Sequence, residues 1–109
     1  MSDSSENINQ LQLYEQSLSN IILQKQQFQS QLNELNSALK EIKKSTESYK
    51  IIGNIMVNVK KEDLTKDLDD KHSMVELRVK TLEKQETSIR EKFEKLQGEV
   101  MKNLEEKND

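Results

Sequence analysis

The sequence contains no cysteine, no proline and no tryptophan, and only two of its 109 residues are glycine. Without cysteine, a disulfide framework and thiolate catalysis are both excluded. Without proline, the composition contains nothing that forces a kink in a long helix. Hydrophobic residues make up 32% of the chain and aromatic residues 4%, which is less than a globular domain ordinarily uses to fill its core. A large core formed by this chain alone is therefore not expected.

The charged residues are numerous but nearly balanced, with 17 basic and 20 acidic side chains and a net charge of −3. Lys and Arg alternate with Asp and Glu, as on a solvated helix surface, and form no basic face of the kind that binds nucleic acid. No apolar run is long enough to cross a bilayer, and the first ten residues lack the basic and apolar regions of a secretory signal. We expect a cytoplasmic protein that binds neither nucleic acid nor membranes.

What the sequence does contain is two heptad series. The first has a positions at Leu11, Leu18, Lys25, Leu32 and Leu39 and d positions at Tyr14, Ile21, Phe28, Leu35 and Ile42. The second has a positions at His72, Val79, Glu86, Phe93 and Val100 and d positions at Leu68, Val75, Leu82, Ile89, Leu96 and Asn103. Apolar residues repeating in this way predict a coiled coil. The predicted fold class is mainly α, an antiparallel two-helix coiled coil in one domain over residues 1–109, with helices at about 6–46 and 61–107.

The register between the helices is set by the segment at residues 47–60, which is long enough to reverse the chain. If Gly53 and Asn54 form a two-residue type II′ turn, the same reversal places Leu39 opposite Leu68. A slip of one heptad is the alternative register.

The favoured register places the two polar breaks of the seam in adjacent layers, with Lys25 opposite Leu82 and Glu86 opposite Ile21. Two interpretations remain open. Either both side chains tolerate partial exposure, or they form an ion pair that fixes the register.

The central stretch YKIIGNIMVNV, residues 49–59, predicts a β-hairpin with strands at 49–52 and 55–59. One face of the hairpin would carry Tyr49, Ile51 and Met56, and the other Ile52, Ile55, Val57 and Val59. A two-stranded hairpin with two apolar faces and two open edges is only marginally stable in water. We therefore expect hairpins from several chains to complete a shared β-barrel. The alternative is a loop that folds back on the coil.

The stretch Tyr49-Lys50-Ile51-Ile52-Gly53-Asn54-Ile55-Met56-Val57, together with the start of the second helix at residues 60–86, resembles prefoldin. The single hairpin resembles the β-type subunit, since α-type subunits have two. The resemblance implies a hexamer of α-type and β-type subunits whose hairpins form a double β-barrel and whose coiled coils project from it. It implies an ATP-independent chaperone, without a cofactor, that holds unfolded polypeptides between the coil tips and passes them to a group II chaperonin.

The tips predicted to bind clients lie where the two chain ends meet. The candidate residues are Ile8, Leu11, Leu13, Tyr14, Phe93, Leu96, Val100, Met101 and Leu104. Four of them, Ile8, Leu13, Met101 and Leu104, fall outside the a and d positions, so one two-helix seam cannot bury them all. Scattered exposed apolar residues are also normal on protein surfaces. The alternative function is therefore a structural scaffold or tether that binds no client.

Catalytic and metal sites are not expected. His72 is the only histidine and no cysteine accompanies it, while the carboxylates are spread over solvated faces. The chain also lacks a glycine-rich phosphate loop.

Overall fold

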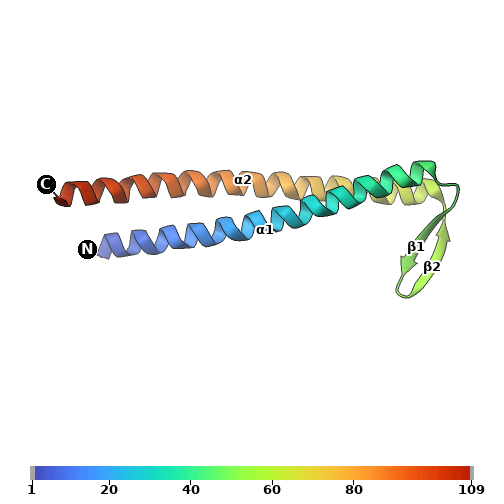
Figure 1. Ribbon diagram of the computed structural model, residues 1–109, viewed down its shortest axis with the longest axis horizontal. Coiled ribbons are helices and arrows are strands. Elements are labelled where there is room, and N and C mark those ends of the chain that lie inside the picture. The colour runs from blue at the N-terminus through green and yellow to red at the C-terminus, as the bar shows by residue number, and fades with distance from the viewer. Residues whose placement is uncertain (1, 109) are drawn as a thin grey trace. The chain divides into compact units, whose positions relative to one another are not determined.

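The computed structural model describes the backbone of residues 2–108 and the side chains of residues 4–106. Helix α1 spans Ser2–Lys44, strand β1 Ser48–Ile52, strand β2 Ile55–Val59 and helix α2 Lys61–Asn108 (Figure 1). The predicted fold class, two long helices around one central β-hairpin, is confirmed. Helix α1 begins four residues before the expected start at about residue 6 and ends two residues before the expected end at about residue 46.

The chain divides into two compact units, each of which pairs a segment of α1 with a segment of α2. Unit 1 contains the described residues up to 26 and from 81 onward, and unit 2 contains residues 27–80 with the hairpin. Each unit is described separately below.

In unit 1 the two helix segments run antiparallel (Figure 1). Their a and d side chains form a narrow, mostly apolar seam. Ile21 and Leu82 are buried in it. The other predicted a and d residues of this unit are half-buried, except for the exposed Asn103. Ser4 and Asn7 continue the heptad spacing toward the start of α1 and are also half-buried. Heptad spacing thus identifies the inward-facing positions, because side chains three and four residues apart share one helix face.

Unit 2 buries Ile42 of α1 and Val79 of α2, and its helices end at the hairpin. Lys43 and Lys44 lie in the last turn of α1, where positive charge complements the carbonyl end of the helix dipole. The first turn of α2 carries Glu62 and Asp63, where negative charge faces the free amide groups. The charged residues at the two helix ends that border the hairpin therefore stabilise both helices.

The hairpin is an antiparallel pair with Ser48 opposite Val59 and Ile52 opposite Ile55. Gly53 adopts a φ of 60° and is the only residue with positive φ in the described part of the chain. A two-residue turn with positive φ at its first residue alone matches the predicted type II′ turn. Strand β1 starts one residue before the expected Tyr49, because Ser48 also pairs across the sheet.

Candidate functional site: the hairpin and the helix ends

The hairpin exposes apolar side chains on both of its faces. The strand register places Tyr49, Ile51 and Met56 on one face, as predicted, and Ile51 is 70% exposed. The other face carries the predicted Ile52, Ile55, Val57 and Val59, of which only Val59 is half-buried. Strands β1 and β2 form the whole sheet within the described chain, so both strand edges are open. Exposing so much apolar surface to water is unfavourable, and pairing with another chain would bury it.

Within unit 2, one polar contact joins the hairpin to α2 and another joins the two helix ends. The Lys50 ammonium lies 3.9 Å from the Asp67 carboxylate of α2. The Lys61 ammonium donates a hydrogen bond of 3.2 Å to the Lys43 carbonyl at the end of α1. These contacts are exposed and each contributes little energy. The apolar side chains of the hairpin remain largely exposed beside them.

Glu47 and Ser48 mark the point where the chain enters strand β1. The Tyr49 hydroxyl donates a 2.6 Å hydrogen bond to the Glu47 carboxylate, and this bond raises the pKa of the tyrosine. The Ser48 side chain is buried, and its Oγ has no hydrogen-bond partner. An unpaired buried hydroxyl is destabilising, and we have no account of why serine stands here.

In unit 1, the nine predicted tip residues separate into two groups. We define the tip as the first turns of α1 and the last turns of α2. Leu11, Tyr14, Phe93, Leu96 and Val100 occupy the seam and are half-buried. Ile8, Leu13, Met101 and Leu104 lie outside it and are between 48% and 58% exposed. The second group therefore supplies the apolar surface that the coil leaves open.

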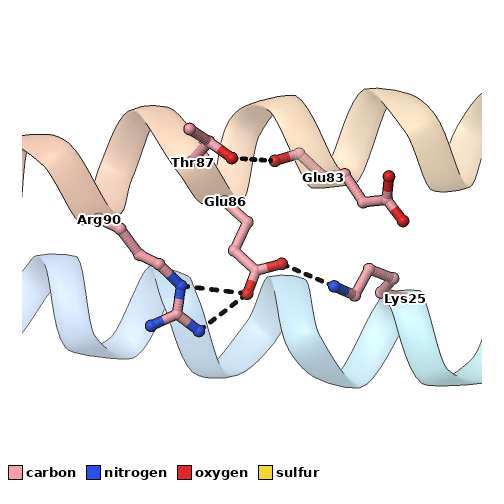
Figure 2. A network of polar contacts seen from close by, with 5 residues as sticks. All are labelled: Lys25, Glu83, Glu86, Thr87 and Arg90. Atoms are coloured by element: carbon pink, nitrogen blue, oxygen red, sulfur yellow. Dashed lines mark hydrogen bonds and ion pairs between the residues drawn. The ribbon is translucent and has the colours of Figure 1, made fainter.

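The two polar breaks of the seam meet in unit 1, as Figure 2 shows. Lys25 Nζ of α1 donates a 2.7 Å hydrogen bond to Glu86 Oε1 of α2. Arg90, one turn further along α2, donates to Glu86 Oε2 from Nη2 at 2.8 Å and from Nε at 3.2 Å. The side chains of Lys25 and Glu86 are only 22% and 14% exposed. Of the two interpretations, the ion pair is thus the one observed, while its effect on register stays a prediction.

The charge environment of Glu86 favours its ionised form. The hydrogen bond from Lys25 has the largest effect on the Glu86 pKa and lowers it, and the bond from Arg90 lowers it further. Burial acts in the opposite direction but does not reverse the shift. Arg90 lies outside the a and d positions, so the heptad pattern did not identify it. Its spacing of four residues from Glu86 is the signal that could have done so.

Other polar side chains form no recognisable reaction centre. His72 Nδ1 lies 3.7 Å from a carboxylate oxygen of Glu76, which is one turn away on α2; the histidine is half-buried and the glutamate exposed. The guanidinium carbon of Arg78 lies 5.7 Å from the centre of the Phe28 ring, a cation–π contact that the heptad pattern did not reveal. Among the described side chains, no group of three or more His, Asp or Glu is placed to hold a metal ion. Within the same residues, no helix has the length and apolar character needed to cross a membrane.

Two helices around one uncovered hairpin define a class of coiled-coil subunit that is built to assemble with other chains. Over residues 5–107 the sequence matches the family model described as Prefoldin subunit, and the chain belongs to the prefoldin family. This family consists of non-enzymatic chaperones, and the chain is accordingly a subunit of an oligomeric prefoldin assembly. The resemblance predicted from residues 49–57 is confirmed.

The relatives agree on the type of subunit. The chain is 40% identical over 94 residues to the prefoldin subunit beta of Archaeoglobus fulgidus, covering 84% of this chain and 81% of that one. It is 39% identical over 93 residues to the prefoldin subunit beta of Sulfolobus acidocaldarius, covering 83% and 74%. The crystal structure of the prefoldin beta subunit from Thermococcus strain KS-1 superposes with a TM-score of 0.89 at 30% identity, covering 95% and 94%. Both the sequence relatives and the structural relative are therefore β-type subunits.

Proposed function

We propose that the chain is a holdase subunit, which binds unfolded polypeptides at its tip without ATP and delivers them to a group II chaperonin in the cytoplasm. The observation that carries this proposal is the group of four half-exposed apolar side chains, Ile8, Leu13, Met101 and Leu104, at the ends of the helices in unit 1. They are free of the seam and accessible to an apolar segment of a client. The flexible Met101 adapts to clients of different shape.

The size of this surface sets the strength of binding. Fully burying one large apolar side chain contributes about 1.5–3 kcal/mol, and these four are already about half covered, so each adds roughly 1 kcal/mol. After the entropy lost on binding, a single tip holds a client only weakly. Several tips that act on one client raise the affinity through their effective concentration. The proposed function therefore requires an assembly.

The hairpin supplies the contact for that assembly in our proposal. Its two apolar faces and open edges fit a β-barrel shared with an α-type subunit and further β-type copies in a hexamer. Support comes from the exposure of Ile52 and Ile55, which are 57% and 67% exposed in the isolated chain. Apolar side chains exposed in adjacent positions mark an interaction surface.

The alternative function is a structural scaffold or tether that assembles in the same way but binds no client. The balanced charges along both helices favour it, since a well-solvated coil needs no further partner. The two functions share every assembly contact. They differ only in whether the exposed apolar residues of the tip are used.

Suppression of aggregation separates the two. The assembled complex is mixed without ATP with a denatured model protein on dilution, and light scattering is followed. Replacement of Ile8, Leu13, Met101 and Leu104 by Gln, a good helix former, should abolish most of the suppression. The control replaces Leu23, Met74 and Leu77 by Gln, since these residues are similarly exposed but lie away from the helix ends.

Equal suppression by the tip variant and the control would rule out the tip as the client site, and no suppression by the unmodified complex would favour the scaffold. Delivery needs its own measurement. A labelled client bound to the complex should move to a group II chaperonin on mixing, and should stay bound when the chaperonin is left out.

A further inference from the structure

The net negative charge of the chain is concentrated at the tip. The side chains of residues 4–15 and 93–106, which include all nine tip candidates, comprise six acidic and two basic groups. Residues 16–92 contain 12 acidic and 14 basic side chains, so this longer part of the chain is slightly positive. Although the charges of the whole sequence are nearly balanced, the end that carries exposed apolar residues of both helices is therefore acidic.

The charged groups of the tip are all exposed. They are Glu6, Glu15, Glu94, Glu99, Glu105 and Glu106, with Lys95 and Lys102. The five ion pairs between described residues all lie outside the tip. The carboxylates of the tip are thus not engaged by basic groups of the described chain, and their charge is available to a bound partner.

Helical spacing brings acidic and apolar side chains onto the same helix faces. On α2, Leu104 and Glu105 follow Met101 by three and four residues. On α1, Glu6 precedes Leu13 by seven residues, which is two turns or about 10 Å. At physiological salt an exposed charge acts over about 8 Å. A client segment that covers the apolar side chains therefore lies in the negative field of these carboxylates.

We propose that the tip preferentially binds client segments that combine apolar residues with Lys or Arg, and disfavours apolar segments that carry Asp or Glu. This inference rests on the proposed holdase function, since it specifies which clients the same surface binds. Apolar contact alone does not distinguish the two kinds of segment. The carboxylates do, because they attract a basic side chain beside the apolar contact and repel an acidic one. The aliphatic stems of Lys and Arg also cover apolar surface while their charged ends reach outward.

The preference of one tip is small and grows with assembly. An exposed pair of opposite charges changes affinity by at most about fivefold. A client that contacts several tips at once multiplies this preference. The preference also depends on salt, because the distance over which charges act falls from about 10 Å at 0.1 M to about 3 Å at 1 M.

Fluorescence anisotropy with unstructured peptides measures the preference. Three labelled peptides share the same apolar residues and differ only at the positions between them, which are Lys, Glu or Gln. Titrated with the complex assembled with an α-type partner at 0.1 M salt, the Lys peptide should bind at least about tenfold more tightly than the Glu peptide. At 1 M salt the two affinities should become nearly equal.

Matched variants assign the effect to the tip of this chain, because the contribution of the partner subunits is the same in both. The tip variant replaces three exposed acids by Gln, namely Glu99, Glu105 and Glu106. The control variant makes the same change at three exposed acids away from the tip, namely Glu34, Glu41 and Glu83. Gln is a good helix former, so both variants should retain the fold. The ratio of the Lys to the Glu affinity should fall at least about threefold in the tip variant and stay unchanged in the control.

The Gln peptide separates failure of this proposal from failure of the holdase function. If the Gln peptide binds but the Lys and Glu peptides bind equally tightly at 0.1 M salt, the holdase function stands and the charge preference is wrong. The preference is equally wrong if the tip variant keeps the full ratio. If none of the three peptides binds the unmodified complex, the holdase function itself fails and the preference fails with it.

Discussion

Gly53 is the residue whose conformation makes the hairpin possible. Its φ of 60° is strained for any residue with a Cβ, although a Cβ there would meet no atom within 4 Å. We expect Gly53→Ala to lower the free energy of unfolding by about 1 kcal/mol through backbone strain alone. Gly98 is the matched control, since it lies in α2 with equally open space around it, and Gly98→Ala should stabilise by about 0.5–1 kcal/mol.

Urea unfolding of both variants, followed by circular dichroism, measures the two effects. An equal change of the same sign at both glycines would contradict the role assigned to the turn.

Glu86 gives the seam a dependence on pH. Lys25 from α1 and Arg90 from α2 hold its pKa below the ordinary value, so the folded chain binds this proton less readily than the unfolded chain. The resulting stability is present above the unfolded pKa of about 4.3 and is lost as the pH falls through the lower folded value. Glu86→Gln should therefore flatten the loss of thermal stability between about pH 5 and pH 3.

Melting temperatures across that range, compared with Glu99→Gln at an exposed position of α2, provide the measurement. If the melting temperature falls equally with decreasing pH in the unmodified chain and in Glu86→Gln, the network around Glu86 contributes nothing to stability in acid.

Residue-level prediction succeeded where periodicity alone determined the answer. Lys25 and Glu86 were expected near each other because the favoured register places these two polar breaks in adjacent layers, and the structure joins them. Arg90 and the stacking of Arg78 on Phe28 were missed, since long side chains outside the seam have many possible partners. Ser48 was also missed, because serine has no preference for strands and its pairing with Val59 depends on the register of the whole hairpin.

At the level of the elements, the hairpin is predicted to hold the assembly together while the helices form independently of it. Replacing Ile52 and Ile55 by Asp puts two charges on directly opposite, exposed positions of one face. Like charges in opposite positions also repel across the strands. We expect the assembly to dissociate while most of the helical circular dichroism signal remains.

Analytical ultracentrifugation of this variant measures the dissociation. Leu23→Asp, an exposed apolar residue of α1 outside the hairpin, serves as the control and should assemble normally. If the hairpin variant assembles as fully as the control, the hairpin is not the contact between subunits.

Element bounds were predictable to within a few residues because the apolar spacing and the glycine turn are strong local signals. The ends of α1 were predicted less accurately. Its first turns consist of Ser, Asp, Glu and Asn, which contribute no apolar spacing, and the helix nevertheless begins at Ser2. At the other end Ser45 leaves the helix and bonds through its hydroxyl to the Glu47 carbonyl at 2.6 Å. Serine, asparagine and aspartate side chains can replace helix hydrogen bonds with bonds to the nearby backbone. The neighbouring structure determines which of the two forms, and so where the helix ends.

For the molecule as a whole, the hydrophobic core that one chain forms by itself is small, while much apolar surface stays exposed. Only four apolar residues, Ile21, Ile42, Val79 and Leu82, are buried among the described side chains. We expect the chain alone to assemble incompletely, and to give one discrete species with an α-type partner. Light scattering after size exclusion, with and without that partner, measures the native mass in multiples of the 12.8 kDa chain. A single discrete hexamer of this chain alone would contradict the need for a partner.

Composition predicted the small core, and the two apolar faces of the hairpin predicted the need for partners. The identity of the partners could not follow from the same reasoning. Apolar hairpin faces accept any chain that offers a matching strand edge, and one sequence contains only one side of that contact. The role of the nine tip residues stays a prediction for the same reason.

Both ends of the described chain belong to unit 1, beside Ile8 and Leu104. A purification tag or fused domain at either end would therefore begin next to the proposed client surface. Such a fusion would obstruct a client or add contacts of its own. Quantitative capture assays accordingly call for cleavable tags. The same position also gives a protein engineer a route to a chaperone with chosen specificity, since a small binding module fused there would share its target with the tip.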